Sequence, residues 1–144
     1  MIDSILVVCA GNICRSPMAE GILRARRPDK TVASAGLSAV IGHEADMCAI
    51  GLLQSRGIDI SAHRARQLVS WQCLHADLIL TMDRKQKTTI QGWLPHVRGK
   101  VFRVGEFVDI DIDDPYRKGS RAFEHALERI DVGLNAWISK METL

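Results

Sequence analysis

The sequence predicts an α/β protein in which helices cover both faces of a mostly parallel, four-stranded sheet, the arrangement called doubly wound. Four short apolar runs rich in β-branched residues alternate with stretches whose apolar residues recur every three to four positions. The length of 144 residues suits one domain with a sizeable core, so residues 1–144 are expected to form a single domain. Apolar residues make up 47% and charged residues 25% of the chain, which is a globular balance.

The first strand and the first helix are marked most clearly. The run SILVVCA, residues 4–10, is continuously apolar, as in a strand that is buried on both faces. From Ser16 the apolar spacing becomes helical, Ser16 is a suitable N-cap, and Pro17 suits the first turn, where a missing N–H costs nothing. Pro28 then ends the helix.

The same alternation continues to the end of the chain. Three further runs have the composition of buried strands, at residues 30–36, 77–82 and 99–105. Three further helices are expected. The first covers about Asp46–Arg56 and ends before Gly57, and the second begins at Arg84 with Asp83 as N-cap. The third covers residues 123–141. Strands that alternate with helices in this way favour a parallel sheet.

Charge and cysteine content narrow the classes of function. The formal net charge is only +2, so nucleic-acid binding and attachment to a membrane surface are disfavoured, and any anion has to be recognised locally. No segment approaches the ~20 apolar residues of a membrane helix, and the N-terminal stretch lacks the basic region of a secretory signal. We therefore expect a cytoplasmic protein without membrane insertion. Its cysteines are expected to be reduced, with an oxidised regulatory pair as the alternative: Cys9, Cys14, Cys48 and Cys73.

The loop after the first strand has the features of a phosphate site. Ligands of parallel sheets bind at the carboxyl ends of strands, and Cys9 stands at such an end. The following helix offers unpaired N–H groups and the positive end of its dipole. Arg15 can add a bidentate fork to two phosphate oxygens, which lysine cannot do. Gly11 and Asn12 tolerate the turns that such a loop needs. The predicted loop residues are Ala10, Gly11, Asn12, Ile13, Cys14 and Ser16.

The same surroundings favour a reactive thiolate at Cys9. Thiol pKa values fall from about 8.5 to roughly 3.5–7.5 at helix N-termini or beside cations. Cys9 is therefore expected to attack the phosphorus of a group that Arg15 holds. Ser16 can donate a hydrogen bond to the sulfur when that sulfur becomes the leaving group.

The segment CAGNICRSP, residues 9–17, resembles the phosphate loop of the low-molecular-weight protein tyrosine phosphatases. The Cys-x5-Arg spacing is weak on its own, but the buried strand before it, the Ser-Pro at the helix start and the distal DDPYRKG, residues 113–119, make the match specific. The resemblance spans essentially the whole chain. It implies a flavodoxin-like, three-layer α/β/α fold and hydrolysis of phosphotyrosine through a cysteinyl-phosphate intermediate.

An acid is needed as well, because free phenol has a pKa of about 10 and a phenolate leaves more easily when it is protonated. The acidic loop of residues 109–119 supplies carboxyl groups, and the resemblance assigns the role to Asp114, directly before Pro115. Asp114 would act first as acid and then as base toward water. The sequence has no convincing metal-ligand cluster, and no metal or cofactor is expected.

The resemblance also implies supporting and cleft residues. Ser34 and His63 match members of a hydrogen-bond network that, with Asn12 and Ser16, holds the loop in its shape. Cys14 matches a second loop cysteine that can form a disulfide with Cys9, a role that also depends on proximity and on exposure to solvent.

The walls of the substrate cleft depart from the eukaryotic pattern. Tyr116 matches one aromatic wall, but the opposite wall falls at or near Val40, and Arg117 stands where eukaryotic members often carry a second tyrosine. This less aromatic cleft resembles the bacterial subgroup that acts on tyrosine autokinases controlling capsule or exopolysaccharide export. The expected partner is therefore the cytoplasmic domain of a membrane tyrosine autokinase, with inorganic phosphate as product.

Three other functions fit parts of the pattern. An arsenate reductase needs two further relay cysteines, and Cys48 and Cys73 are widely spaced. Protein-arginine phosphatases of the same family carry Thr where this chain has Ile13. A non-enzymatic phosphate-binding module needs neither the thiol nor the acid, and this chain has both.

Asp-Pro is also a common turn signal, which gives Asp114 a purely structural alternative.

Overall fold

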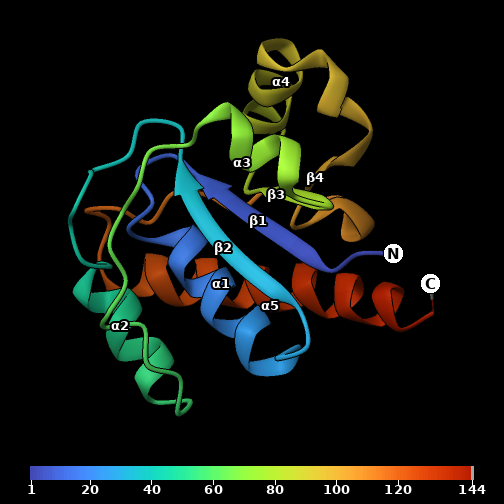
Figure 1. The fold of residues 1–144 in the computed structure, drawn as a ribbon. Coiled ribbons are helices and arrows are strands. Elements are labelled where there is room, and N and C mark those ends of the chain that lie inside the picture. Colours follow the sequence, from blue (N-terminus) through green and yellow to red (C-terminus); the bar gives the residue numbers. More distant parts are fainter. Residues whose placement is uncertain (144) are drawn as a thin grey trace.

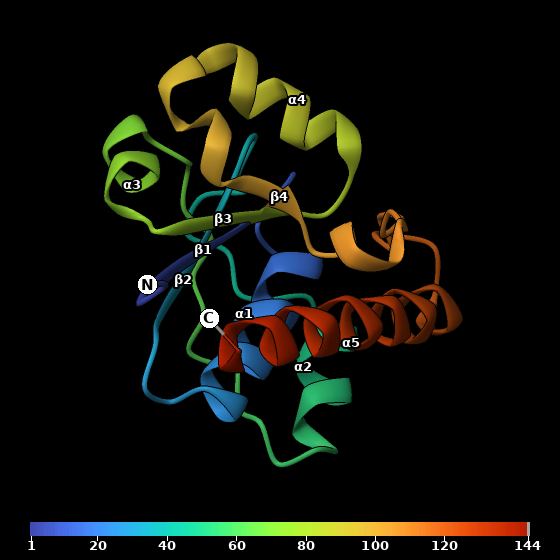
Figure 2. The same cartoon turned by 90° about the vertical axis from the view of Figure 1, so that its right-hand side faces the viewer.

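A parallel sheet of four strands lies at the centre of the computed structural model, which describes residues 1–143 (Figures 1 and 2). The strands are β1 (Ser4–Cys9), β2 (Thr31–Gly36), β3 (Leu78–Thr81) and β4 (Val101–Arg103). Their order in the sheet is β2-β1-β3-β4. The chain therefore moves to one side of β1 for β2 and to the other side for β3, which makes the end of β1 the switch point where ligands of such sheets bind. The predicted fold class is confirmed.

Helices cover both faces of the sheet (Figures 1 and 2). One face packs on α1 (Arg15–Arg26), α2 (Met47–Gln54) and the long α5 (Ser120–Glu142), and the other on α3 (Ser70–His75) and α4 (Arg84–Trp93). Strand β1 shows why its sequence is apolar throughout. Ile5 and Val7 belong to the core on the α1 side, whereas Leu6 and Val8 belong to the core on the α4 side.

Two predicted helix boundaries are wrong. Helix α1 begins at Arg15, and Cys14 is its N-cap residue without a side-chain capping bond. Ser16 is therefore the second residue of the helix and not its N-cap. Its hydroxyl group bonds to Cys9 and Asn12 instead of capping the helix backbone. Helix α2 ends at Gln54, two residues before the predicted Arg56, in a turn that needs a positive φ of 76° at Gly57.

Other boundaries follow the sequence signals. Asp46 caps α2 by accepting from the Cys48 amide, and Asp83 caps α4 by accepting from the Gln86 amide. Helix α3 and the 3-10 helices η1 (Pro95–Lys100) and η2 (Glu106–Val108) were not predicted. Because η1 extends to Lys100, β4 starts at Val101 and not at the predicted Gly99. In the described part of the chain, every helix is too short or too polar to cross a membrane.

Candidate active site

A small pocket with a volume of about 190 Å³ opens at the carboxyl end of β1. Cys9, Arg15 and Asp114, the three predicted catalytic residues, all line it, although Asp114 is far from the other two in the sequence. Val40 and Tyr116 line it as well, where the cleft walls were expected. The remaining lining comes from the phosphate loop, which we define as residues 9–16: Ala10, Gly11, Ile13 and Cys14.

The Cys9 sulfur faces the start of helix α1. Its Sγ lies 2.9 Å from the Ser16 Oγ, and Cys9 is only 2% exposed. The Asn12 Nδ2 donates to the same Oγ at 2.8 Å. Because Asn12 donates to the Ser16 oxygen, the hydroxyl proton is available for the sulfur, and Ser16 can stabilise a thiolate at Cys9 by donating to it.

Asn12 is the conformational centre of the phosphate loop. It has a positive φ of 59°, which a non-glycine residue adopts at a cost of order 1–3 kcal/mol unless its surroundings fix it. Its side chain donates to Ser34 Oγ at 3.0 Å and accepts from the Arg66 amide at 3.0 Å. Its backbone oxygen lies 2.7 Å from His63 Nε2. The structure thus places Ser34 and His63 directly against Asn12.

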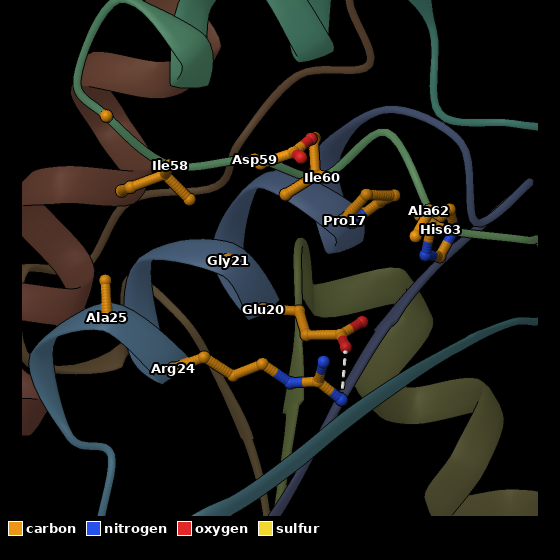
Figure 3. A pocket seen from close by; sticks show the side chains of 11 residues that line it. Pro17, Glu20, Gly21, Arg24, Ala25, Ile58, Asp59, Ile60, Ala62 and His63 are labelled. Carbon is orange, nitrogen blue, oxygen red and sulfur yellow. Dashed lines mark ion pairs between the residues drawn. The ribbon is translucent and has the colours of Figure 1, made fainter.

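This network continues to a residue that sequence reasoning missed. Ser34 Oγ donates to Glu20 of α1, and Glu20 is paired with Arg24 at 2.9 Å. The only sequence signal for Glu20 is the spacing of four residues to Arg24, which is common on helix surfaces. Figure 3 shows this ion pair in a groove of about 440 Å³ between α1 and residues 57–63. That groove is larger than the pocket at the end of β1, but neither Cys9 nor Asp114 lines it.

Arg15 joins the two sides of the pocket. It is 3% exposed, and its Nη1 donates to the backbone oxygen of Ile112 at 2.7 Å. The Arg15 guanidinium also lies 3.8 Å from a carboxylate oxygen of Asp114 and 3.8 Å from one of Asp83. The Arg15 Nε is buried and has no hydrogen-bond partner among the described residues. A buried, unsatisfied N–H is costly, and a bound anion in the adjoining pocket would satisfy it.

The acid loop, defined as residues 109–117, is held by a second buried arginine. Arg103, at the end of β4, donates to Asp109 at 2.8 Å and to Asp111 at 2.9 Å and is 4% exposed. The hydrogen bond from Arg103 and its charge lower the pKa of Asp109. The signal for Arg103 in the sequence is a lone cation at the end of an apolar strand before an acidic segment, and sequence reasoning did not use it.

Asp114 itself is open to solvent. Its side chain is 47% exposed, and Oδ1 accepts from the Tyr116 amide at 3.1 Å. This bond closes a short turn that fixes the carboxylate at the mouth of the pocket. The Arg117 guanidinium lies over the Tyr116 ring, 5.1 Å from the ring centre.

Cys14 was expected to be exposed, but it is buried, with only 4% of its surface exposed. Burial raises the pKa of the Cys14 thiol far above its ordinary value, and the charges of Asp46 and Asp114 raise it further. Cys14 therefore stays protonated at neutral pH. Among residues 1–143, no three His, Cys, Asp or Glu side chains are grouped so that they can hold a metal ion.

The fold and the pocket define an α/β domain with a buried arginine and a cysteine side by side at the carboxyl end of β1, a place suited to an anion. The chain belongs to a family described as low molecular weight phosphotyrosine protein phosphatase, whose model matches residues 4–144. One curated relative, the probable low molecular weight protein-tyrosine-phosphatase EpsP of Ralstonia nicotianae, is 51% identical over 144 residues, which cover 100% of this chain and 99% of the relative.

Solved structures show the same fold. The Vibrio vulnificus Wzb in complex with benzylphosphonate is 41% identical, with a TM-score of 0.93, and the match covers 97% of this chain and 99% of that one. The YwlE arginine phosphatase from Geobacillus stearothermophilus is also similar, at 32% identity and a TM-score of 0.91, covering 98% of this chain and 94% of that one. The family therefore includes proteins named for more than one substrate.

Proposed function

We propose that this chain hydrolyses phosphotyrosine in proteins through a phosphorylated cysteine. The observation that carries the proposal is the meeting of Cys9, Arg15 and Asp114 in one pocket that is closed at the sides by Val40 and Tyr116. A tyrosyl ring fits between these two side chains, with its phosphate on the loop amides and on the Arg15 fork. Names of the curated relatives support tyrosine as the substrate.

In the first step, the Cys9 thiolate attacks phosphorus and forms the P–S bond while the bond from phosphorus to the tyrosyl oxygen breaks. Asp114, protonated at this stage, gives its proton to the leaving oxygen. The exposure of Asp114 allows it to gain or lose a proton from solvent between turnovers. The Arg15 guanidinium and the loop amides hold the charge that spreads over the non-reacting phosphoryl oxygens.

In the second step, Asp114 acts as a carboxylate and takes a proton from a water molecule. The oxygen of that water attacks phosphorus, the P–S bond breaks, and inorganic phosphate forms. The sulfur leaves as a thiolate, which the Ser16 hydroxyl stabilises from 2.9 Å. The enzyme then holds phosphate with Cys9 and Asp114 restored to the states that the next cycle needs.

Two rival functions fit the structure less well. An arsenate reductase of this fold would pass a disulfide outward through further cysteines, but Cys73 is buried in α3 on the opposite face of the sheet from Cys9. An arginine phosphatase is closer, because YwlE shares the fold. Ile13, which lines the pocket with an apolar side chain, favours a flat aromatic ester over a guanidinium phosphate.

The biological setting is a further part of the proposal. We infer that residues 1–144 act as one cytoplasmic phosphatase domain, which the family match over residues 4–144 supports. The partner that we propose is the phosphorylated cytoplasmic domain of a tyrosine autokinase in capsule or exopolysaccharide production. The less aromatic cleft, with Val40 as a wall, supports that assignment.

The test compares a phosphotyrosine peptide with a phosphoarginine peptide of the same sequence, in buffer that contains EDTA. We expect the purified chain to favour the tyrosine peptide in kcat/KM by at least about tenfold, a difference of about 1.4 kcal/mol in transition-state binding. Cys9→Ser is the control and should release no phosphate from either peptide. Preference for the arginine peptide would overturn the assignment of the substrate.

A further inference from the structure

A second groove, with a volume of about 690 Å³, adjoins the catalytic pocket on the side of α2. Ile13 of the phosphate loop and Tyr116 of the acid loop line both the groove and the pocket. The groove therefore starts where a bound phosphotyrosyl ring would leave the pocket. Nothing in the proposed chemistry uses it.

Helix α2 turns one apolar face toward this groove. Met47 and Ile50 stand three positions apart on α2, and both line the groove, as do Gly51 and Gln54. Met47 is 86% exposed, so a large apolar side chain lies in solvent next to the catalytic pocket. Exposed apolar surface that borders a functional pocket is characteristic of a binding site.

Gly51 lines this groove from within helix α2. It is the fifth residue of the helix Met47–Gln54, where glycine costs about 1 kcal/mol of helix stability relative to alanine. Backbone geometry does not require glycine there, because the glycines with positive φ are Gly42, Gly57 and Gly119. Crowding does not require it either, because an added Cβ would meet no heavy atom within 4 Å. Because no side chain projects from Gly51, the part of the groove next to it stays open.

We propose that this groove receives an apolar side chain of the protein substrate, located within two residues of the phosphotyrosine. The inference rests on the proposed phosphatase function and adds a preference for sequence to it. An extended peptide advances about 3.3 Å per residue, so a neighbour of the phosphotyrosine passes over the shared wall of Ile13 and Tyr116 into the groove. The exposed Glu44, which also lines the groove, disfavours an acidic neighbour by like-charge repulsion.

The test uses phosphotyrosine peptides that differ at one position within two residues of the phosphotyrosine, where they carry Leu, Ser or Asp. The measured quantity is kcat/KM of each peptide divided by kcat/KM of p-nitrophenyl phosphate, which is too small to reach the groove. For at least one position, Leu is expected to exceed Ser by about five- to tenfold, which corresponds to partial burial of the side chain. Asp is expected to give the lowest value.

Two variants and one control connect the preference to the groove. Gly51→Leu fills the groove and should bring the ratio of Leu to Ser to about one; Met47→Glu changes an exposed residue and should reduce the same ratio. Gly92→Leu is the matched control, because Gly92 is in α4 and an added Cβ there also meets nothing within 4 Å. It should keep the preference of the unmodified chain.

The outcomes separate this inference from the function on which it rests. If the chain hydrolyses p-nitrophenyl phosphate but shows equal values for Leu and Ser at every position, the groove is not a substrate site. The same conclusion follows if Gly51→Leu and Met47→Glu both keep the full preference. If no aryl phosphate is hydrolysed at all, the proposed function fails, and this inference fails with it.

Discussion

The phosphate loop, residues 9–16, and the acid loop, residues 109–117, face each other across the pocket and differ in their exposure to solvent. Asn12 and Ser16 are fully buried, and Arg15 is 3% exposed. Across the pocket, the Asp114 side chain is 47% exposed and Tyr116 is 41% exposed. The polar side chains of the phosphate loop are thus buried, whereas Asp114 and Tyr116 of the acid loop lie at the surface.

The difference follows from what each side has to do. Dipoles that hold a transferring phosphoryl group are most effective when they are fixed in advance and shielded from water. A residue that acts first as acid and then as base has to admit the water molecule from which it regains its proton. Arg15 connects the two, because it lies in the phosphate loop and donates to Ile112 of the acid loop.

The largest loss of activity is expected from a substitution in the buried phosphate loop. Arg15→Lys keeps the charge but loses the fork and the hydrogen bond to Ile112, so both the phosphate contact and the link to the acid loop are weakened. We expect kcat/KM for p-nitrophenyl phosphate to fall by about 10²–10³. Steady-state kinetics check this, and a loss of less than about fivefold would show that the guanidinium does not hold the phosphoryl group.

A change on the exposed side should depend on the substrate. Asp114→Asn removes the proton donor but leaves the anion site intact, so kcat/KM, which reports the first step, should fall by about 10²–10⁴ for phenyl phosphate, whose leaving group needs the proton. For an aryl phosphate with a strongly acidic phenol the first step should change little. The values of kcat/KM over a series of aryl phosphates measure this, and an equal loss of kcat/KM for all leaving groups would remove Asp114 from the role of acid.

A smaller effect is expected from loosening the acid loop behind Asp114. Arg103→Met removes the hydrogen bonds to Asp109 and Asp111, so Asp114 is held less well. Turnover of poor leaving groups should fall by about tenfold and that of good ones less, with partial recovery in Arg103→Lys. Arg56→Met, which breaks the exposed pair with Asp131, is the matched control and should change neither.

Arg103→Met should also change how the stability of the fold depends on pH in acid. Arg103 lowers the pKa of Asp109 in the folded state. Such a carboxylate stabilises the fold above its unfolded pKa, about 3.9, and loses this contribution as pH falls through the lower folded value. The free energy of unfolding, measured by urea denaturation between about pH 2 and pH 5, should therefore depend less steeply on pH in Arg103→Met than in the unmodified chain. An identical slope in both would show that Arg103 does not act on the folded-state carboxylate.

The buried side was also the more predictable one from sequence. Strand β1 is apolar on both faces, and the residues of the phosphate loop are adjacent in the chain, so their order alone indicates the site. The hydrogen-bond partners of the polar groups could not be predicted from the sequence. Ser16 has the composition of a helix cap, but its hydroxyl group is bonded to Cys9 and Asn12 inside the helix.

The residues that support the pocket from behind were harder to predict on both sides. Arg103 bonds to Asp109 and Asp111 of the acid loop, and Glu20 accepts from Ser34 of β2, but neither Arg103 nor Glu20 belongs to a motif of its own. Cys14 was expected at the surface because it lies in a loop, yet the loop is folded inward and Cys14 is 4% exposed. Helix α3 was missed because its six residues are too few to show a helical period.

The most direct test of this account is to trap the phosphorylated enzyme. Asp114→Asn lacks the base for the second step, so p-nitrophenyl phosphate should phosphorylate it faster than water releases the phosphate. Rapid quenching followed by peptide mass spectrometry should then find one phosphoryl group on the Cys9 sulfur. A quenched enzyme that turns over substrate but carries no phosphoryl group, or carries it on another residue, would contradict the account.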